Sequence, residues 1–155
     1  MSHINYFNIA KSNWEEFKNE TSLVKNTVFT FKENYPEIDK WFTNKVTPGL
    51  ISGDRSIIFL KYKQEDAGFA IVKNDLEEKK ICTFYIFPEF RGKGIASKLF
   101  EESFNVLGTD KPLMTIPENR FQKFKKYTEK FQFKLTMQDH VYQNISKELV
   151  FNGSL

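Results

Sequence analysis

The feature that most constrains this chain is an apolar segment followed at once by a glycine-containing turn and an amphipathic segment. Residues Lys80–Phe87 are mostly apolar on both faces, which is typical of a central strand in a sheet. Pro88 follows, and then Gly92 and Gly94 lie two residues apart. From Gly94 to Leu107 the apolar residues recur at helical spacing. The sequence therefore predicts a buried strand, a tight turn and a helix in direct succession.

The rest of the chain adds strands and helices around this unit. Its 155 residues are the length of one domain, and the element order predicts a single-domain mixed α/β fold over residues 1–155. Further strands are expected at Ile4–Ile9, Ser56–Tyr62, Gly68–Val72, Leu113–Ile116, Phe133–Met137 and Glu148–Phe151. Further helices are expected after a cap at Ser12, from Asn34 to a stop at Pro48–Gly49, and over Glu118–Lys130.

Composition excludes several classes of protein. The single Cys82 and two histidines, His3 and His140, argue against a disulfide framework and against a metal site. The formal net charge of +3 is too small to indicate nucleic-acid binding. No apolar run approaches the ~20 residues of a membrane span, and residues 1–10 lack the pattern of a signal peptide. We therefore expect a cytoplasmic protein that binds neither metal nor membrane.

The turn between the central strand and its helix has the features of a phosphate site. Gly92 and Gly94 can adopt positive φ and allow a ligand close to the backbone. The helix that follows offers unpaired N–H groups at its N-terminus, and Arg91 and Lys93 add positive charge. The alternative is a basic strand-to-helix turn whose glycines serve geometry only. Neither the GxxxxGK[ST] nor the GxGxxG phosphate motif is present.

This segment resembles the GNAT superfamily of acyl-CoA-dependent N-acyltransferases. Arg91–Ala96 matches the superfamily's acyl-CoA signature R/Q-x-x-G-x-G/A, and Phe84–Gly92 matches the strand that precedes it. The resemblance covers about Ile57–Phe133. It implies a mixed, mostly antiparallel seven-stranded sheet that is splayed between its fourth and fifth strands and flanked by about four helices. It also implies acetyl-CoA as donor and CoA as product.

The resemblance assigns residues to the CoA site. The pantetheine arm would pair with the strand backbone at Phe84, Tyr85 and Ile86. The backbone N–H of Ile86 would also stabilise the oxyanion. Asn119 would lie near the CoA arm, or would instead cap the helix that follows Pro117. The pyrophosphate would receive backbone N–H groups from Arg91, Gly92, Lys93, Gly94, Ile95 and Ala96.

The chain departs from the family where many members carry a tyrosine that protonates the departing CoA thiolate. Counted back from Gln132, which replaces a glycine, the tyrosine position holds Thr128, and Tyr127 lies one residue early. One residue is about 100° of helix, so both Tyr127 and Thr128 stay open as the acid. Tyr127 could instead serve core packing, and Tyr142 and His140 are further candidates.

The acceptor amine also needs a base, because an ammonium cannot attack a thioester. Glu77 and Glu78 precede the central strand and are candidates, although a solvated turn explains them better. Cys82 is interpreted as a small buried residue rather than a nucleophile.

Together these features favour an N-acetyltransferase that transfers an acetyl or longer acyl group directly to a primary amine. The acceptor would be a small molecule or a peptide. Its pocket would be shaped by the N-terminal half of the chain, which contains the aromatic residues Tyr35, Trp41 and Phe42. The protein would be a monomer or a homodimer. Two alternatives stay open. One is a non-catalytic acyl-CoA-binding module, and the other is a toxin-like transferase that acts on aminoacyl-tRNA.

Overall fold

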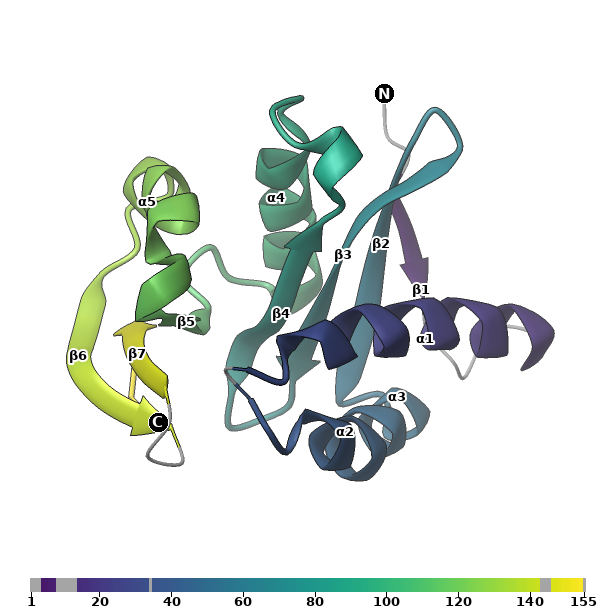
Figure 1. The fold of residues 1–155 in the computed structure, drawn as a ribbon, viewed down its shortest axis with the longest axis horizontal. Helices are drawn as coiled ribbons and strands as arrows, with labels where there is room; N and C mark the ends of the chain where they lie inside the picture. The colour runs from purple at the N-terminus through teal and green to yellow at the C-terminus, as the bar shows by residue number, and fades with distance from the viewer. Residues whose placement is uncertain (1–3, 8–13, 34, 143–145, 155) are drawn as a thin grey trace.

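The computed structural model describes residues 4–7, 14–33, 35–142 and 146–154. The expected cap Ser12 lies outside these residues. Within them the structure has seven strands in one sheet, in the order β1-β2-β3-β4-β5-β7-β6 (Figure 1). The strands are β1 Ile4–Phe7, β2 Arg55–Tyr62, β3 Glu65–Asn74, β4 Lys79–Ile86, β5 Leu113–Pro117, β6 Leu135–Tyr142 and β7 Ser146–Phe151.

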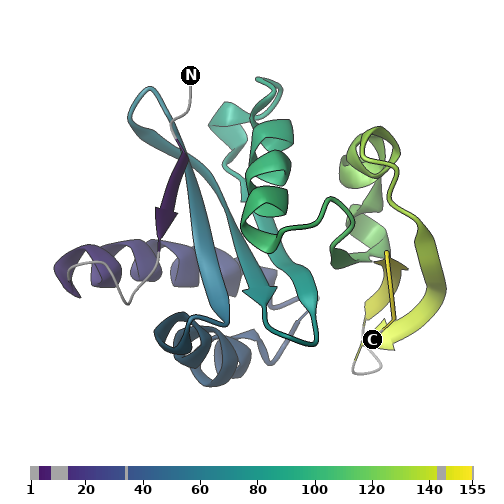
Figure 2. The same cartoon turned by 180° about the vertical axis from the view of Figure 1, so that it is seen from behind.

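Helices cover both faces of this sheet. Figures 1 and 2 show α1, α2 and α3 on one face and α4 on the other, with α5 beside β5–β7. The mixed, mostly antiparallel α/β class is confirmed. The helices are α1 Trp14–Val28, α2 Ile38–Trp41, α3 Thr47–Ser52, α4 Ile95–Leu107 and α5 Phe121–Lys130. None of the described helices is long and apolar enough to cross a membrane.

The helix that was expected from Asn34 to Pro48–Gly49 has different boundaries in the structure. Asn34 lies outside the described residues, and α2 begins at Ile38. The segment after Ile38 does not stop at Pro48–Gly49. It passes through a π-helical turn, Phe42–Val46, into α3 and ends at Gly53, whose φ is 91°. Pro48 lies in the first turn of α3, where a missing N–H leaves no hydrogen bond unmade. The prediction was wrong because the helix restarts at the proline instead of breaking there.

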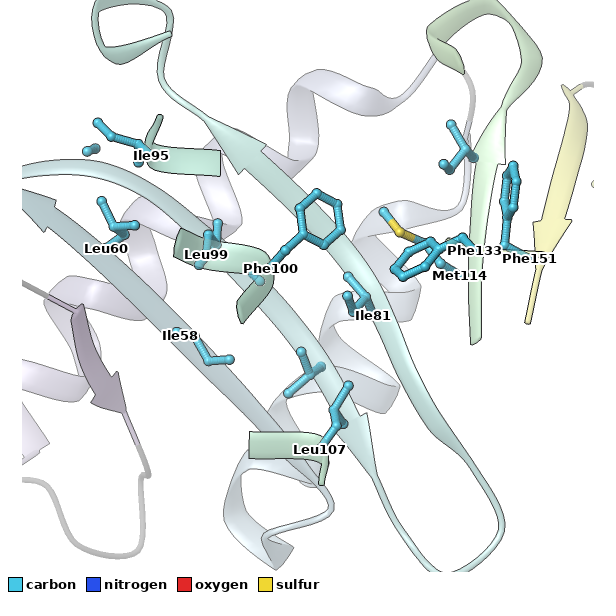
Figure 3. Packing of buried hydrophobic residues seen from close by; sticks show 14 of the residues in the cluster. Ile58, Leu60, Ile81, Ile95, Leu99, Phe100, Leu107, Met114, Phe133 and Phe151 are labelled. Carbon is cyan, nitrogen blue, oxygen red and sulfur yellow. The ribbon is translucent and has the colours of Figure 1, made fainter. Parts of the chain in front are cut away.

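The core consists of two clusters, one on each face of the central strands. Alternate side chains of β2 divide between them, because successive residues of a strand point to opposite faces. Ile58 and Leu60 pack toward α4, whereas Ile57 and Phe59 pack toward α1–α3. Figure 3 shows the first cluster, which also includes Met114, Phe133 and Phe151 from the β5–β7 side.

The sheet opens between β4 and β5. These strands run parallel but pair only at Lys80 with Leu113 and at Ile81 with Met114. Every other neighbouring pair in the sheet is antiparallel. Beyond Ile81 the strands diverge, and Figure 1 shows β5–β7 and α5 standing apart from the end of β4. The expected splay between the fourth and fifth strands is therefore present.

Candidate active site

A cavity of about 580 Å³ lies where β4 and β5 diverge. Thr83 and Phe84 of β4 form one wall, and Thr115 and Pro117 of β5 form part of the other. The segment before β2 adds four side chains, and the rest come from the sheet, from just before β4 and from the start of α5. These other lining residues are Phe31, Tyr35, Ile38, Trp41, Arg55, Lys73, Glu78, Lys80, Cys82, Met114, Ile116, Arg120, Phe124 and Glu148. We call this space the splay cavity.

The backbone of β4 has hydrogen-bonding groups directed at the splay. β3 and β4 are paired as far as Ile86. At the next residue, the N–H of Phe87 donates to the carbonyl of Ala67, 2.9 Å away. N–H directions alternate along an antiparallel strand. The N–H groups of Phe84 and Ile86 therefore point away from β3, toward the side on which β5 has separated. An extended ligand arm could pair with them there.

The turn after β4 has open space beside both of its glycines. Gly92 and Gly94 have φ of 80° and 76°, and a Cβ on either would meet nothing within 4 Å. Gly94 is the N-cap of α4, and no side chain caps this end. The first N–H groups of α4 are thus available to an anion.

The side chain of Arg91 contacts the end of β4 and does not extend into the open space beside the turn. Its Nε donates to the carbonyl of Ile86 at 3.0 Å, and its guanidinium lies 5.5 Å from the ring centroid of Tyr85. Arg91 therefore folds back over the end of β4. What the turn offers a ligand is mainly backbone.

A second, smaller hollow of about 250 Å³ adjoins this turn. We call it the turn hollow. The ammonium of Lys130 donates to Ser97 Oγ at 2.9 Å and so joins α5 to α4 at its edge. The hollow is lined by Gly92, Gly94, Ser97, Lys126, Tyr127 and Lys130, so glycine backbone and two ammonium groups face the same space.

Tyr127 and Thr128 have different surroundings on α5. Thr128 is 6% exposed, and its hydroxyl donates to the carbonyl of Lys125 at 2.9 Å. Tyr127 is half-buried, lies 5.4 Å from Phe100 between ring centroids, and lines the turn hollow. The α5 side chain in the splay cavity is Phe124. Neither candidate acid therefore lines the splay cavity.

The other residues of the C-terminal half that the sequence suggested for the site do not line either cavity in the described part of the structure. Asn119 is exposed in the 3-10 turn Glu118–Arg120 before α5 and lines neither space. The side chains of His140 and Tyr142 lie outside the described part of the structure. Gln132 has a φ of 57°, which is the left-handed conformation that glycine adopts most readily.

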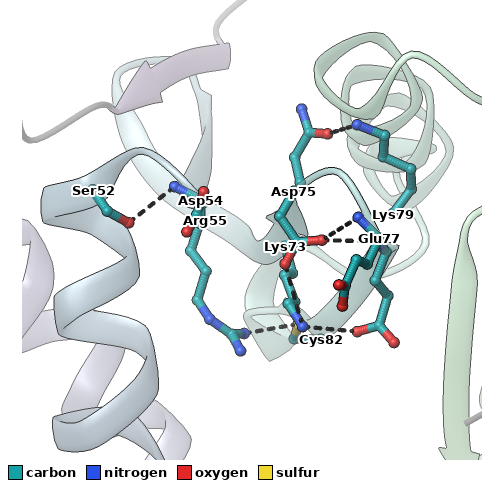
Figure 4. Close-up of polar contacts among 10 residues, drawn as sticks. Ser52, Asp54, Arg55, Lys73, Asp75, Glu77, Lys79 and Cys82 are labelled. Carbon is teal, nitrogen blue, oxygen red and sulfur yellow. Dashed lines mark hydrogen bonds and ion pairs between the residues drawn. The ribbon is translucent and has the colours of Figure 1, made fainter.

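The two acidic residues before β4 differ in position. Glu77 is exposed, and its backbone N–H donates to Asp75 within the turn. Glu78 lines the splay cavity and forms an ion pair with Lys73 at 3.3 Å (Figure 4). Among the described residues no group of three His, Cys, Asp or Glu side chains could hold a metal ion.

Cys82 also lines the splay cavity, half-buried on β4. Burial raises the pKa of its thiol above the usual range, although the nearby charges of Arg55 and Lys80 act in the opposite direction. A thiol with a raised pKa is largely protonated at neutral pH and is a poor nucleophile.

Sequence reasoning missed Glu148, the most deeply buried carboxylate of the splay cavity. Glu148 is 2% exposed, lies on β7 opposite Pro117, and accepts a hydrogen bond from the hydroxyl of Tyr35. The signal was present in the sequence. Glu148 lies two residues before Val150 in a strand, so the two side chains share the buried face, and a carboxylate placed there calls for a functional explanation.

Comparisons with known proteins agree with this geometry. A profile of the acetyltransferase (GNAT) family matches residues 11–109. A GNAT-family protein from Desulfovibrio desulfuricans superposes with a TM-score of 0.68 at 12% identity, over 96% of both chains. Escherichia coli ElaA gives 0.68 at 14% identity, over 97% of this chain and 99% of its own.

The PaiA N-acetyltransferase of Thermoplasma acidophilum, solved in complex with coenzyme A, gives a TM-score of 0.61 at 13% identity, over 99% of this chain and 100% of its own. A comparison with curated protein sequences gives no match. The family profile covers well over half of the chain, and the chain therefore belongs to the GNAT family of acetyltransferases.

Proposed function

We propose that this protein is an N-acetyltransferase that transfers the acetyl group of acetyl-CoA directly to a primary amine. The observation that carries this proposal is the opening between β4 and β5 beside a turn with two left-handed glycines. The pantetheine arm would pair with β4 from Phe84 to Ile86, and the pyrophosphate would bind the backbone of Arg91–Ala96. The thioester would then lie at the mouth of the splay cavity.

In the transfer step the amine nitrogen attacks the thioester carbonyl carbon. A C–N bond forms, the C–S bond breaks, and CoA leaves as a thiolate that takes up a proton. The N–H of Ile86 points into the splay, where it would donate to the oxyanion of the tetrahedral intermediate. Holding the two reactants side by side in the splay would supply much of the rate.

The amine must lose a proton before it attacks, and Glu148 is the best-placed base. Glu78, the alternative in the splay cavity, already forms an ion pair with Lys73. Glu148 pairs with no described cation and is oriented by the hydroxyl of Tyr35. An ammonium that enters the cavity would meet this carboxylate and could transfer its proton to it.

The proton that the thiolate needs has no assigned donor. The hydroxyl of Thr128 already donates within α5, and Tyr127 lines the turn hollow but not the splay cavity. Solvent or a side chain outside the described residues would therefore protonate CoA. Aqueous access suffices, because a thiolate is a good leaving group and takes up a proton after it departs.

The test is a thermal shift followed by turnover. Acetyl-CoA and CoA should each raise the Tm, because a ligand that binds only the folded state stabilises it by mass action. A panel of primary amines with acetyl-CoA should then release free thiol. No shift and no calorimetric binding at millimolar ligand would refute the proposal. Binding without thiol release from any amine would favour the non-catalytic acyl-CoA-binding module.

A further inference from the structure

The charges in the splay cavity do not balance. Lys73 is matched, because Glu78 lies 3.3 Å and Asp75 3.5 Å from its ammonium. Within the described residues the other three cations of the lining form no ion pair with a carboxylate, and Glu148 forms none with a cation. The charged side chains of the lining are Arg55, Lys73, Lys80, Arg120, Glu78 and Glu148.

Arg55 is held in place by groups that do not neutralise it. Its side-chain stem lies on Gly49, where a Cβ would come within 2.7 Å of Cγ and Cδ. Its guanidinium lies 5.8 Å from the ring centroid of Trp41, and Nη1 donates to Cys82 Sγ at 3.2 Å (Figure 4). A thiol is a weak acceptor. The remaining N–H groups of the planar, rigid Arg55 guanidinium therefore border the cavity.

Lys80 adds a second unmatched cation at the same end. In the register of the sheet Arg55 lies opposite Lys73, and Lys73 opposite Lys80. Three basic residues thus lie side by side across β2, β3 and β4, and only the middle one has carboxylate partners. Lys80 and Arg55 both line the cavity around Cys82. Partly desolvated cations are costly unless an anion compensates them.

From this arrangement we propose that the acceptor is an amine that also carries an anionic group, a carboxylate or a phosphate, and that Arg55 and Lys80 bind this group. The proposal rests on the proposed acyl transfer. Glu148 would hold the ammonium on the β7 side. A purely cationic polyamine would add charge to a cavity that already has an excess of it, whereas an amino-acid-like zwitterion would match both signs. The guanidinium is well suited to a carboxylate because it can donate two parallel hydrogen bonds.

The single cysteine allows this anion site to be tested without knowing the acceptor. Iodoacetate and iodoacetamide both alkylate a thiolate with loss of iodide, and only iodoacetate carries a carboxylate. The ratio of their rate constants at Cys82, divided by the same ratio for the uncharged thiol 2-mercaptoethanol, measures attraction of an anion to the cavity independently of the thiol pKa. We expect this quotient to be about fivefold or more in the wild type. It should fall close to one in Arg55→Gln and stay raised in Arg55→Lys.

Lys63→Gln is the matched control, because Lys63 is an exposed cation at the other end of β2. The quotient measured for Lys63→Gln should equal that of the wild type. A quotient near one in the wild type would overturn the proposal. So would a raised quotient that Arg55→Gln does not change. Failure of both reagents to label folded Cys82, even at an alkaline pH at which the thiol ionises, would show that the cavity does not admit a small carboxylate beside Arg55. That result would also overturn it.

The second arm uses substrates. Amino acids and their amides, phosphoethanolamine and simple diamines are compared by thiol release from acetyl-CoA and, with CoA present, by ligand-observed NMR. We expect an anionic amine to exceed its neutral partner about tenfold or more in kcat/KM, with the preference lost in Arg55→Gln. Preference for a carboxylate or for the phosphate distinguishes the two anion types. Turnover of neutral amines and diamines alone would overturn this inference and leave acyl transfer standing, whereas absence of CoA binding would refute the proposed function itself.

Discussion

The hydroxyl of Tyr35 donates a hydrogen bond to Oε1 of Glu148, 113 residues away in the chain. Tyr35 lies just before α2 and Glu148 lies on β7, so the bond joins the helical segment to the β5–β7 part of the sheet, and both residues line the splay cavity. Burial of a carboxylate is costly unless it is hydrogen-bonded. This hydroxyl therefore both lowers that cost and fixes the orientation of the carboxylate.

The first prediction concerns this pair. Glu148→Gln keeps the shape but removes the base, so kcat/KM should fall by roughly 10²-fold or more, while the Kd for CoA should stay within about twofold of the wild-type value. Tyr35→Phe leaves the carboxylate in place and should lose less. Steady-state thiol release and calorimetry measure both quantities.

The control for Glu148 is Glu118→Gln, because Glu118 is an exposed carboxylate, 57% accessible, whose ion pair with Lys147 lies at the surface. Its activity should be that of the wild type. Full activity in Glu148→Gln at unchanged Tm would show that another group deprotonates the amine.

The second prediction concerns the turn before α4. Gly94→Asp should weaken CoA binding far more than Lys93→Ala. It places a negative charge and a side chain where the pyrophosphate would approach the backbone, whereas Lys93 is an exposed charge worth about 1 kcal/mol or less. Calorimetric Kd values for CoA compare the two variants.

Gly108→Asp is the matched control for backbone strain. Gly108 caps the other end of α4 with a φ of 72°, against 76° for Gly94. Gly108→Asp should lower the Tm at least as much as Gly94→Asp, because a carboxylate is favourable at the N-terminus of a helix and unfavourable at its C-terminus. Only Gly94→Asp should affect CoA binding. Equal Kd values in Gly94→Asp and Lys93→Ala would mean that the ligand is not bound through the backbone of the turn.

The parts of the fold that the sequence predicted are those with a local cause. Lys80–Phe87, the glycines at 92 and 94 and the helical stripe to Leu107 each act over a few residues, and β4, the turn and α4 lie where these patterns place them. The stop at Pro48–Gly49 failed because a proline is equally compatible with the first turn of a new helix.

The acceptor side of the site could not be predicted in this way. Glu148 acquires its role from Tyr35, and Arg55 from Gly49, Trp41 and Cys82. Three of these four contacts, those made by Tyr35, Trp41 and Cys82, join residues that are far apart in the chain. The strand pattern around Val150 indicates that Glu148 is buried, but no local pattern identifies the distant partners of Glu148 and Arg55, whereas the CoA turn is one contiguous stretch.

The third prediction concerns the pH dependence of Cys82. Only the thiolate is alkylated, and burial raises the pKa of this thiol. A raised pKa means less thiolate at a given pH, so the rise in alkylation rate should occur at higher pH than for glutathione. Iodoacetamide labelling followed by mass spectrometry measures this at the single cysteine.

The Arg55 charge lowers the pKa of Cys82, so its removal in Arg55→Gln should move the alkylation profile to still higher pH. The Lys63→Gln profile should coincide with that of the wild type. A profile for folded wild-type protein at lower pH than that of glutathione would show that the positive charges outweigh burial, and it would reopen Cys82 as a nucleophile.

The last prediction concerns Tyr127, and it separates two readings of α5. Gln132 has the positive φ that suits the glycine of the family pattern. This supports using Gln132 as the reference position for aligning α5 with the family. In that alignment Tyr127 lies one residue away from the position of the family's acid. Its side chain packs on Phe100 and lines the turn hollow rather than the splay cavity. Tyr127→Phe keeps the ring and should lose less than about tenfold in kcat, against the 10²–10⁴-fold that general acid catalysis typically contributes. A fall of a hundredfold or more at unchanged Tm would place the Tyr127 hydroxyl at the thiolate when CoA is bound. If activity survives, the solvent-protonation route proposed for the leaving CoA gains support, and the rate should then vary with the pKa of the leaving thiol in a series of acyl-thioester analogues.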